Sequence, residues 1–267
     1  MSGRVVRLAV LGDPLRYTRS PELHRAGLAA VGMACVSRAI PTPIARLGER
    51  LHMLHADGVH GVNLTIPLKE RALDHLDRVS DASRAARSVN TVGFAADGSW
   101  GDTTDGAGFV AWLERLGRDP RQERVHLLAT GGAARSLARA LRESGAEVSA
   151  SARRPESASA DLFGTVVAWR GEAEAARLAA ATVIVNASPL EDPNAIVPLD
   201  RVAPAALVVD LRYGPEPTPL VTRARSLGRE AHDGLGLLVH QARASLAAWL
   251  GMAVPLEPLE RAVKLTR

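Results

Sequence analysis

The sequence of 267 residues has little material for cross-links, for aromatic packing or for a membrane anchor. Its single cysteine, Cys35, permits no internal disulfide, and no group of cysteines and histidines has the spacing of a zinc site. Aromatic residues make up 3%, so leucine, valine and alanine must fill the core. No apolar run reaches the roughly 18 residues that a membrane span needs, and the N-terminal segment has the pattern of a strand rather than a signal peptide. We therefore expect a metal-free protein of the cytoplasm.

Lysine is also scarce, because among 33 lysines and arginines only Lys69 and Lys264 are lysines. A lysine can release its proton when its surroundings lower its pKa, whereas an arginine effectively cannot. Lys69, in mid-chain, is therefore a mild pointer to chemistry that needs lysine. The net charge is only +4, and the arginines are scattered without aromatic residues among them, which argues against nucleic-acid binding. We expect a small-molecule substrate, no membrane partner, and a monomer or homodimer.

Short runs rich in valine and leucine alternate with helical patterns, which predicts an α/β fold with parallel sheets. Near-continuous apolar runs of this length suit strands that are buried on both faces. The predicted strands are residues 7–12, 61–67, 125–129, 146–151, 164–169, 182–186 and 206–211. The predicted helices are residues 20–32, 105–117, 133–145 and 233–251. Ser20 is the expected N-cap of the first helix, with Pro21 at the first helical position.

The stretch VHLLATGGAARSLARAL, residues 125–141, has the form of a strand joined to a helix by a dinucleotide-binding turn. In the common pattern G-x-G-x-x-G/A, the first glycine allows the bend, the second admits the pyrophosphate and the third permits close packing of the helix. Gly131 and Ala134 keep the second and third positions, but Ala129 occupies the first, so we expect weaker binding than a glycine would give. The alternative is a turn that binds nothing.

The end of the next predicted strand indicates which nucleotide would bind. An NAD-binding chain has an acidic residue about 20 residues after the turn, whereas Arg153 and Arg154 stand here and suit the 2′-phosphate of NADP. We therefore predict two domains, the second a Rossmann-like NADP-binding domain over residues 106–235. The first, over residues 1–105 with 236–267, would bind substrate and carry catalysis, with the C-terminal helices folding back onto it.

Six motifs, in order along the chain, resemble the signatures of the shikimate dehydrogenase family. They read GDPLRYTRSPELH, NLTIPLK, SVNTV, GDTTDG, VVDLRYGPEPTPL and DGLGLLVHQA. Each motif is weak alone, but the ordered set extends from about residue 7 to 251. The resemblance implies an oxidoreductase of aromatic amino-acid biosynthesis that reversibly reduces 3-dehydroshikimate to shikimate with NADPH.

The resemblance also implies the site residues. When a hydride reaches a ketone, negative charge develops on oxygen and a proton must arrive. Lys69 and Asp105 would be the catalytic pair, sharing a proton with the substrate hydroxyl; a plain surface ion pair is the alternative. Hydroxyl and amide side chains suit a polyhydroxy acid, and those implied to bind it are Thr18, Ser20, Thr65, Asn90, Tyr213 and Gln241. The residues implied to bind NADP are Ala129, Thr130, Gly131, Gly132, Ala133, Arg153, Arg154, Asn186, Ser188, Leu211 and Gly234.

The sequence departs from the family pattern at several positions. Thr18 and Thr103 stand where serine and asparagine are usual, which bears on substrate choice. Glu191 and Asp192 arrive early in the loop that follows a predicted strand, and we expect their charge to repel NADP. We expect His24 to be structural rather than catalytic. Two other activities remain open: a quinate/shikimate dehydrogenase, and a binding module with impaired cofactor binding.

Overall fold

The computed structural model describes residues 5–15 and 17–265, which form two compact units. Unit 1 extends to Gly108 and resumes at Leu238, and unit 2 runs from Phe109 to Leu237. Both units are mixtures of helices and strands, which confirms the predicted α/β class. Within the described part of the chain, no helix has the length and apolar character needed to cross a membrane.

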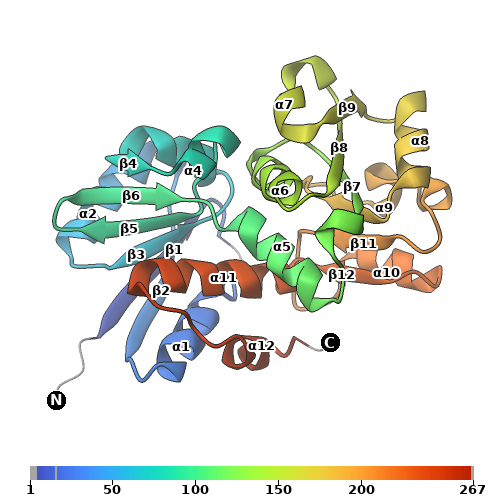
Figure 1. The fold of residues 1–267 in the computed structure, drawn as a ribbon. Coiled ribbons are helices and arrows are strands. Elements are labelled where there is room, and N and C mark those ends of the chain that lie inside the picture. Colours follow the sequence, from blue (N-terminus) through green and yellow to red (C-terminus); the bar gives the residue numbers. More distant parts are fainter. Residues whose placement is uncertain (1–4, 16, 266–267) are drawn as a thin grey trace. The chain divides into compact units, whose positions relative to one another are not determined.

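Unit 1 is built on a six-stranded sheet in the order β2-β1-β3-β5-β6-β4 (Figure 1). The first three strands of this order are parallel, but β5 is antiparallel to both β3 and β6. The expectation of parallel sheets is therefore wrong for this half, because a two-residue turn before Gly98 (φ +120°) folds β5 and β6 into a hairpin. The strands are β1 Val6–Gly12, β2 Cys35–Pro41, β3 Gly61–Leu64, β4 Arg78–Val79, β5 Thr91–Ala95 and β6 Gly98–Asp102.

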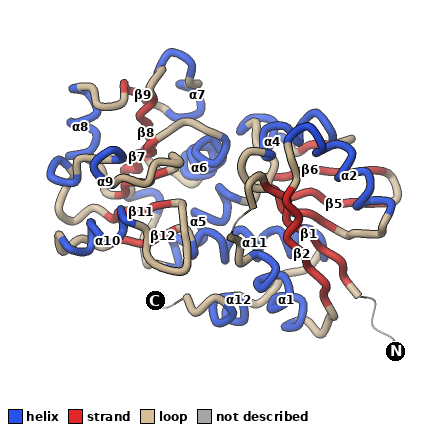
Figure 2. Tube along the Cα trace, turned by 180° about the vertical axis from the view of Figure 1, so that it is seen from behind, coloured by secondary structure: helices blue, strands red, loops and turns tan. Residues whose placement is uncertain are grey.

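Helices cover both faces of this sheet. On one face, Ala9 and Leu11 of β1 share an apolar core with Leu51 of α2. Successive side chains of a strand point to opposite faces, and Asn63 of β3 points to the other face, where it contacts α1 and α11. Helix α12 packs against α1, and both views show the two side by side, as the predicted folding back requires (Figure 2). The helices are α1 Ser20–Ala30, α2 Leu47–Ala56, α3 Leu68–Arg71, α4 Asp81–Ala86, α11 Leu235–Leu250 and α12 Glu257–Ala262, with 3₁₀ turns at Ile44–Arg46 and Ala72–His75.

The start of α1 differs from the prediction and its end agrees. Ser20 is the first helical residue, and Arg19 takes the N-cap position without a capping hydrogen bond from its own side chain. The interpretation of Ser20 as an N-cap is therefore wrong, and its hydroxyl is not committed to the helix end. At the other end, Gly32 adopts φ +76°, and the amide of Met33 bonds to the carbonyl of Leu28 at 2.9 Å.

Unit 2 has a six-stranded sheet that is parallel throughout, in the order β12-β11-β10-β7-β8-β9. Counted from β7, this is the Rossmann order, in which a ligand binds at the carboxyl ends of the strands where the order reverses. That point lies between β7 and β10. The strands are β7 Arg124–Leu128, β8 Glu147–Ala152, β9 Thr165–Ala168, β10 Val183–Asn186, β11 Leu207–Asp210 and β12 Ala231–Asp233.

The helices of unit 2 bury both faces of its sheet. Leu137 and Leu141 of α6 pack on one face, and Leu178 of α8 and Leu220 of α10 pack on the other. The helices are α5 Asp105–Arg115, which begins in unit 1, α6 Gly132–Glu143, α7 Ala160–Phe163, α8 Glu172–Ala180, α9 Pro193–Ile196 and α10 Pro219–Ser226. Three 3₁₀ turns lie at Pro120–Gln122, Pro155–Ser157 and Leu199–Arg201.

Candidate active site and cofactor pocket

Lys69 and Asp105, which are 36 residues apart in sequence, meet in unit 1. Lys69 lies on the short helix α3, directly after β3, and Asp105 is the first residue of α5. Lys69 Nζ donates to Asp105 Oδ2 at 2.5 Å, and the side chains are only 17% and 6% exposed. The N-terminus of α5 favours the carboxylate anion. This pair is largely enclosed, so it does not match the alternative of a surface ion pair.

Asn90 holds the other oxygen of the carboxylate. The backbone N–H of Thr104 donates to Asn90 Oδ1 at 2.8 Å, and this contact fixes which end of the amide carries the NH₂ group. Asn90 Nδ2 therefore donates to Asp105 Oδ1 at 2.8 Å and to Gln241 Oε1 at 3.1 Å. Both oxygens of the aspartate are thus bonded to predicted site residues. Asn90 is 1% exposed, so its side chain is engaged by the protein itself.

Gln241 reaches Asn90 because α5 and α11 approach closely. A Cβ at Gly108 of α5 would lie 2.7 Å from the backbone nitrogen of Gln241, closer than real Cβ atoms come. Only glycine at this position lets the two helices pack as they do. Gln241 Nε2 donates to the carbonyl of Leu238 at 3.0 Å, which orients its oxygen toward Asn90.

Thr18, Ser20 and Thr65 follow the carboxyl ends of the parallel strands β1 and β3, where ligands of such sheets bind. Thr18 Oγ1 accepts from the backbone N–H of Ser20 and lies 3.2 Å from its hydroxyl, so the two hydroxyls are neighbours. A Cβ at Gly12 would lie 2.4 Å from Thr65 Cγ2. Because glycine has no Cβ, the ends of β1 and β3 can lie this close together. Tyr213, the remaining predicted substrate residue, is half-buried in unit 2 after β11.

Thr104 also belongs to this group of residues, although only the neighbouring Thr103 was singled out in the sequence. Thr104 is 5% exposed, and its hydroxyl accepts from Asn90 Nδ2 at 2.9 Å. Its position directly before Asp105, at the start of a helix, is the signal that would have indicated it.

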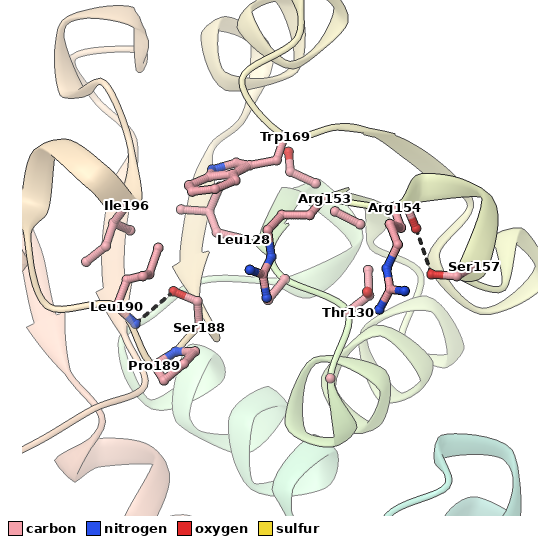
Figure 3. A pocket seen from close by; sticks show the side chains of 14 residues that line it. Leu128, Thr130, Arg153, Arg154, Ser157, Trp169, Ser188, Pro189, Leu190 and Ile196 are labelled. Carbon is pink, nitrogen blue, oxygen red and sulfur yellow. Dashed lines mark hydrogen bonds between the residues drawn. The ribbon is translucent and has the colours of Figure 1, made fainter.

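A pocket of about 260 Å³ lies in unit 2 at the carboxyl ends of β7, β8, β9 and β10 (Figure 3). This is the position that the Rossmann strand order predicts for a nucleotide. Six residues of the predicted cofactor set line it: Ala129, Thr130, Gly131, Arg153, Arg154 and Ser188. Sequence analysis did not name the other lining residues, which are Leu128, Ser151, Ala152, Ser157, Trp169, Pro189, Leu190 and Ile196. Trp169 had one available signal, its position at the end of the strand beside β8.

The turn after β7 has an unusual backbone. Ala129 adopts φ +110°, a conformation that favours glycine and that a Cβ atom opposes. Gly131, in contrast, has an ordinary φ of −73°, and a Cβ there would meet no protein atom within 4 Å. The protein itself thus needs a glycine at position 129, where it has alanine. At position 131 the absence of a side chain leaves open space beside the N-terminus of α6. The backbone N–H groups there can bind phosphate.

Arg153 and Arg154 extend from the end of β8 into this pocket (Figure 3). Within residues 5–15 and 17–265, neither guanidinium has an acidic partner. Glu191 instead pairs with Arg212 at 2.6 Å, and Asp192 accepts from the backbone of Asn194 at the start of α9. Neither acid lines the pocket. Arg212 thus offsets the charge of Glu191, whereas Asp192 keeps its charge, and the expected repulsion of NADP stays a prediction.

Five predicted cofactor residues lie outside this pocket: Gly132, Ala133, Asn186, Leu211 and Gly234. The first two begin α6. Asn186 is fully buried and accepts from the amide and hydroxyl of Ser188, so it orders the pocket loop from behind. A Cβ at Gly234 would lie 2.1 Å from the carbonyl oxygen of Leu211, so these two residues pack tightly together. Within the described residues, no group of three His, Cys, Asp or Glu side chains is arranged to hold a metal ion.

Comparison with known proteins agrees with this geometry. Residues 10–92 match the shikimate dehydrogenase substrate binding domain. A shikimate dehydrogenase (NADP(+)) of Acidiphilium cryptum is 40% identical over 98% of this chain and 97% of its own, and one of Dinoroseobacter shibae is 36% identical over 96% of each. A crystal structure of the Thermus thermophilus shikimate 5-dehydrogenase with NADP(H) and shikimate superposes with TM-score 0.86, at 34% identity, covering 97% of this chain and 98% of that one. A 5-ketofructose reductase of Gluconobacter has TM-score 0.80 at 26% identity, covering 98% of both. The resemblance seen in the sequence is confirmed, and the chain belongs to the shikimate dehydrogenase family.

Proposed function

We propose that this protein catalyses the reversible, NADP-dependent reduction of 3-dehydroshikimate to shikimate. The observation that carries the proposal is the enclosed Lys69–Asp105 pair, braced by Asn90 and Gln241, in a chain of this family. Relatives across the full length of the chain are named for this reaction. We further propose that unit 1 binds the substrate and unit 2 the cofactor, and that the protein works in the cytoplasm as a monomer or homodimer.

The residues of unit 1 would manage the proton. NADPH supplies the hydride that adds to the ketone carbon, and charge then develops on the ketone oxygen. Lys69 Nζ would donate its proton to that oxygen, and Asp105 would hold the nitrogen in line through the 2.5 Å contact. In the reverse direction the same pair would take the proton of the substrate hydroxyl. Asn90 would keep the carboxylate from rotating away, since it bonds the second oxygen.

The hydroxyls at the ends of β1 and β3 would recognise the substrate. Thr18 and Ser20 would bind the carboxylate, and their neighbouring hydroxyls offer two donors to one anionic group. Thr65 and Gln241 would bind ring hydroxyls, with Asn90 behind Gln241. The role of Tyr213 in substrate binding is proposed from the family resemblance alone. Because Ser20 is not a helix cap, its hydroxyl, which accepts from Thr18 Oγ1, keeps its own proton to donate to the substrate.

The residues of the unit 2 pocket fit NADP. Arg153 and Arg154 present two guanidinium groups that have no acidic partner among the described residues, which suits the dianionic 2′-phosphate. The space at Gly131 and the N–H groups of α6 suit the pyrophosphate. Trp169 offers an indole for the adenine, with the guanidinium of Arg170 on the ring at 5.1 Å from its centroid.

The test is NADPH oxidation, followed at 340 nm, with 3-dehydroshikimate. Lys69→Ala should lower kcat by about 100-fold or more, the range of general acid–base catalysis. The chain offers a matched control in Lys264, its other lysine, which is exposed. Lys264→Ala should leave kcat unchanged. Turnover of the unaltered protein that does not exceed that of the Lys69→Ala variant would refute the proposal.

A second candidate activity has a specific observation in its favour. Thr18 adds a methyl group where the family usually has serine, and a 5-ketofructose reductase shares the fold. A substrate site with this extra methyl group would favour another polyhydroxy ketone or a quinate-like acid. Comparison of kcat/KM for shikimate, quinate and 5-ketofructose would decide, and we expect shikimate to be highest.

A further inference from the structure

A buried histidine lies behind the site, on the face of the unit 1 sheet that α1 and α11 cover. His24 has no exposed surface, and its ring nitrogens lie 2.8 Å from Ser37 Oγ and 2.8 Å from Asn63 Oδ1. Its ring meets Trp249 edge-on, with centroids 5.5 Å apart. Burial lowers the pKa of His24 to about 4, so the imidazole is neutral near pH 7. No step of the proposed reaction uses this side chain directly.

The protonation of His24 follows from its partners. Asn63 Nδ2 donates to the backbone oxygen of Asn90 at 2.9 Å, and a carbonyl oxygen can only accept, so the Asn63 amide has one possible orientation. Its Oδ1 therefore faces His24, and His24 Nε2 must carry the proton. His24 Nδ1 is then the acceptor for the hydroxyl of Ser37. The histidine thus holds Asn63 in the orientation that lets it bond to Asn90.

Ser245 of α11 joins the same group of residues from the other side. Its Oγ lies 3.0 Å from Asn63 Nδ2, 2.7 Å from Thr91 Oγ1 and 3.1 Å from Thr104 Oγ1. The two threonine hydroxyls in turn lie 3.1 and 3.2 Å from Asn90 Oδ1. Asn90 is therefore held through both its backbone oxygen and its side-chain oxygen by groups that Ser245 touches.

We propose that His24 and Ser245 are positioning residues, which fix Asn90 so that its NH₂ group keeps the Asp105 carboxylate aligned with Lys69. The proposal rests on the function proposed above. Every side chain between His24 and Asn90 is at most 5% exposed. Bulk water does not reach these groups, so we expect removal of one of them to disturb the orientation of its neighbours. Neither positioning residue touches Lys69 or Asp105, so both act only through Asn90 and its partners.

Ser245→Ala tests this with the smallest change, because it removes one hydroxyl and leaves the helix intact. We expect kcat to fall about tenfold, since small misplacements of catalytic groups are costly, while the KM for shikimate and the Kd for NADP change less than about twofold. Ser83→Ala is the matched control. Ser83 is a fully buried serine of unit 1 whose hydroxyl has no partner among the described residues, and its loss should leave kcat unchanged.

A double-mutant cycle separates positioning from a contribution to stability alone. If Ser245 acts through the carboxylate, Ser245→Ala should cost much less activity in an Asp105→Asn background than in the unaltered protein. A purely structural serine would lower the melting temperature and leave kcat, measured well below it, unchanged. His24→Gln, which keeps an N–H donor, should retain more activity than His24→Ala. Should the histidine variants fail to fold, the serine cycle still decides.

Two results would overturn the inference while leaving the proposed function intact. One is a folded Ser245→Ala protein with kcat within about twofold of the unaltered enzyme, and the other is full additivity with Asp105→Asn. Absence of turnover in the unaltered protein would instead refute the proposed function itself, so the two failures are distinguishable.

Discussion

Replacement of Ala129 by glycine should stabilise unit 2. Ala129 has φ +110°, and a non-glycine residue held in such a conformation costs about 1–3 kcal/mol. Glycine removes that cost but adds about 0.4–1 kcal/mol of entropy to the unfolded chain. With mid-range values, about 2 kcal/mol of strain against about 0.7 kcal/mol of entropy, the net gain is about 1.3 kcal/mol. It corresponds to roughly 3–5 °C in melting temperature for a chain of this size.

The control for this substitution is Ala140→Gly, in the interior of α6. There the helical backbone gains nothing from glycine, and we expect a loss of about 1 kcal/mol. Urea unfolding followed by circular dichroism would give both values. If Ala129→Gly destabilises the protein as Ala140→Gly does, the argument from backbone strain is wrong.

The same substitution should tighten NADP binding, because Ala129 lines the pocket and its methyl group stands at the bend. We expect the Kd measured by calorimetry to fall by about three- to tenfold, or roughly 0.7–1.4 kcal/mol. An unchanged Kd would show that the bend, although strained, already has the shape that the pyrophosphate needs.

Three other predictions follow from single features of the structure. Replacement of Arg153 and Arg154 by alanine should raise the Kd for NADP by about 10- to 100-fold, as expected for charge-assisted hydrogen bonds, with little effect on the Kd for NAD. Burial lowers the pKa of both His24 and His126 to about 4, against about 6.5 in the unfolded chain, so the unfolded state binds protons first as the pH falls. Urea unfolding should therefore show stability lost between pH 6.5 and 4, by about 3 kcal/mol for each histidine, and a flat profile over this range would contradict the burial argument. Gly234→Ala should destabilise unit 2 by about 2 kcal/mol or more, since a Cβ there would lie 2.1 Å from a carbonyl oxygen; an unchanged unfolding midpoint would refute this.

The fold of unit 2 was more accessible from the sequence than that of unit 1. Five strands of unit 2, β7 to β11, were predicted within one residue at each end. Four of them are buried on both faces and are near-continuous apolar runs, while the edge strand β9 is only half-buried but carries two adjacent valines. Strand β2 was missed because it lies at an edge with most side chains outward, and β5 and β6 because their glycines and half-exposed residues interrupt the pattern. The Asp97–Gly98 turn was the available hairpin signal.

For the candidate site, the sequence indicated most of the residues but not the contacts between them. The resemblance indicated which residues to examine, but no spacing rule predicts that Asn90 and Gln241, 151 residues apart, share a hydrogen bond. Thr104 and Ser245 were missed for a related reason. Threonine and serine are common at helix starts and within helices. Only three-dimensional contact shows that Thr104 bonds to the amide of Asn90, that Ser245 bonds to the amide of Asn63, and that the two hydroxyls lie 3.1 Å apart.

The structure also changes which departure from the family pattern matters most. The sequence suggested two obstacles to NADP binding, a strained bend and a nearby pair of acids. Neither acid lines the pocket, and Arg212 offsets the charge of Glu191, so we expect the electrostatic obstacle to be the smaller one. The larger obstacle is then conformational and belongs to one residue, Ala129. The two have different signatures, because repulsion between charges weakens as salt is added whereas backbone strain does not respond to salt. The gain in NADP affinity from Ala129→Gly should therefore be the same at low and high salt, and a gain that changes with salt would show that charge, after all, governs the bend.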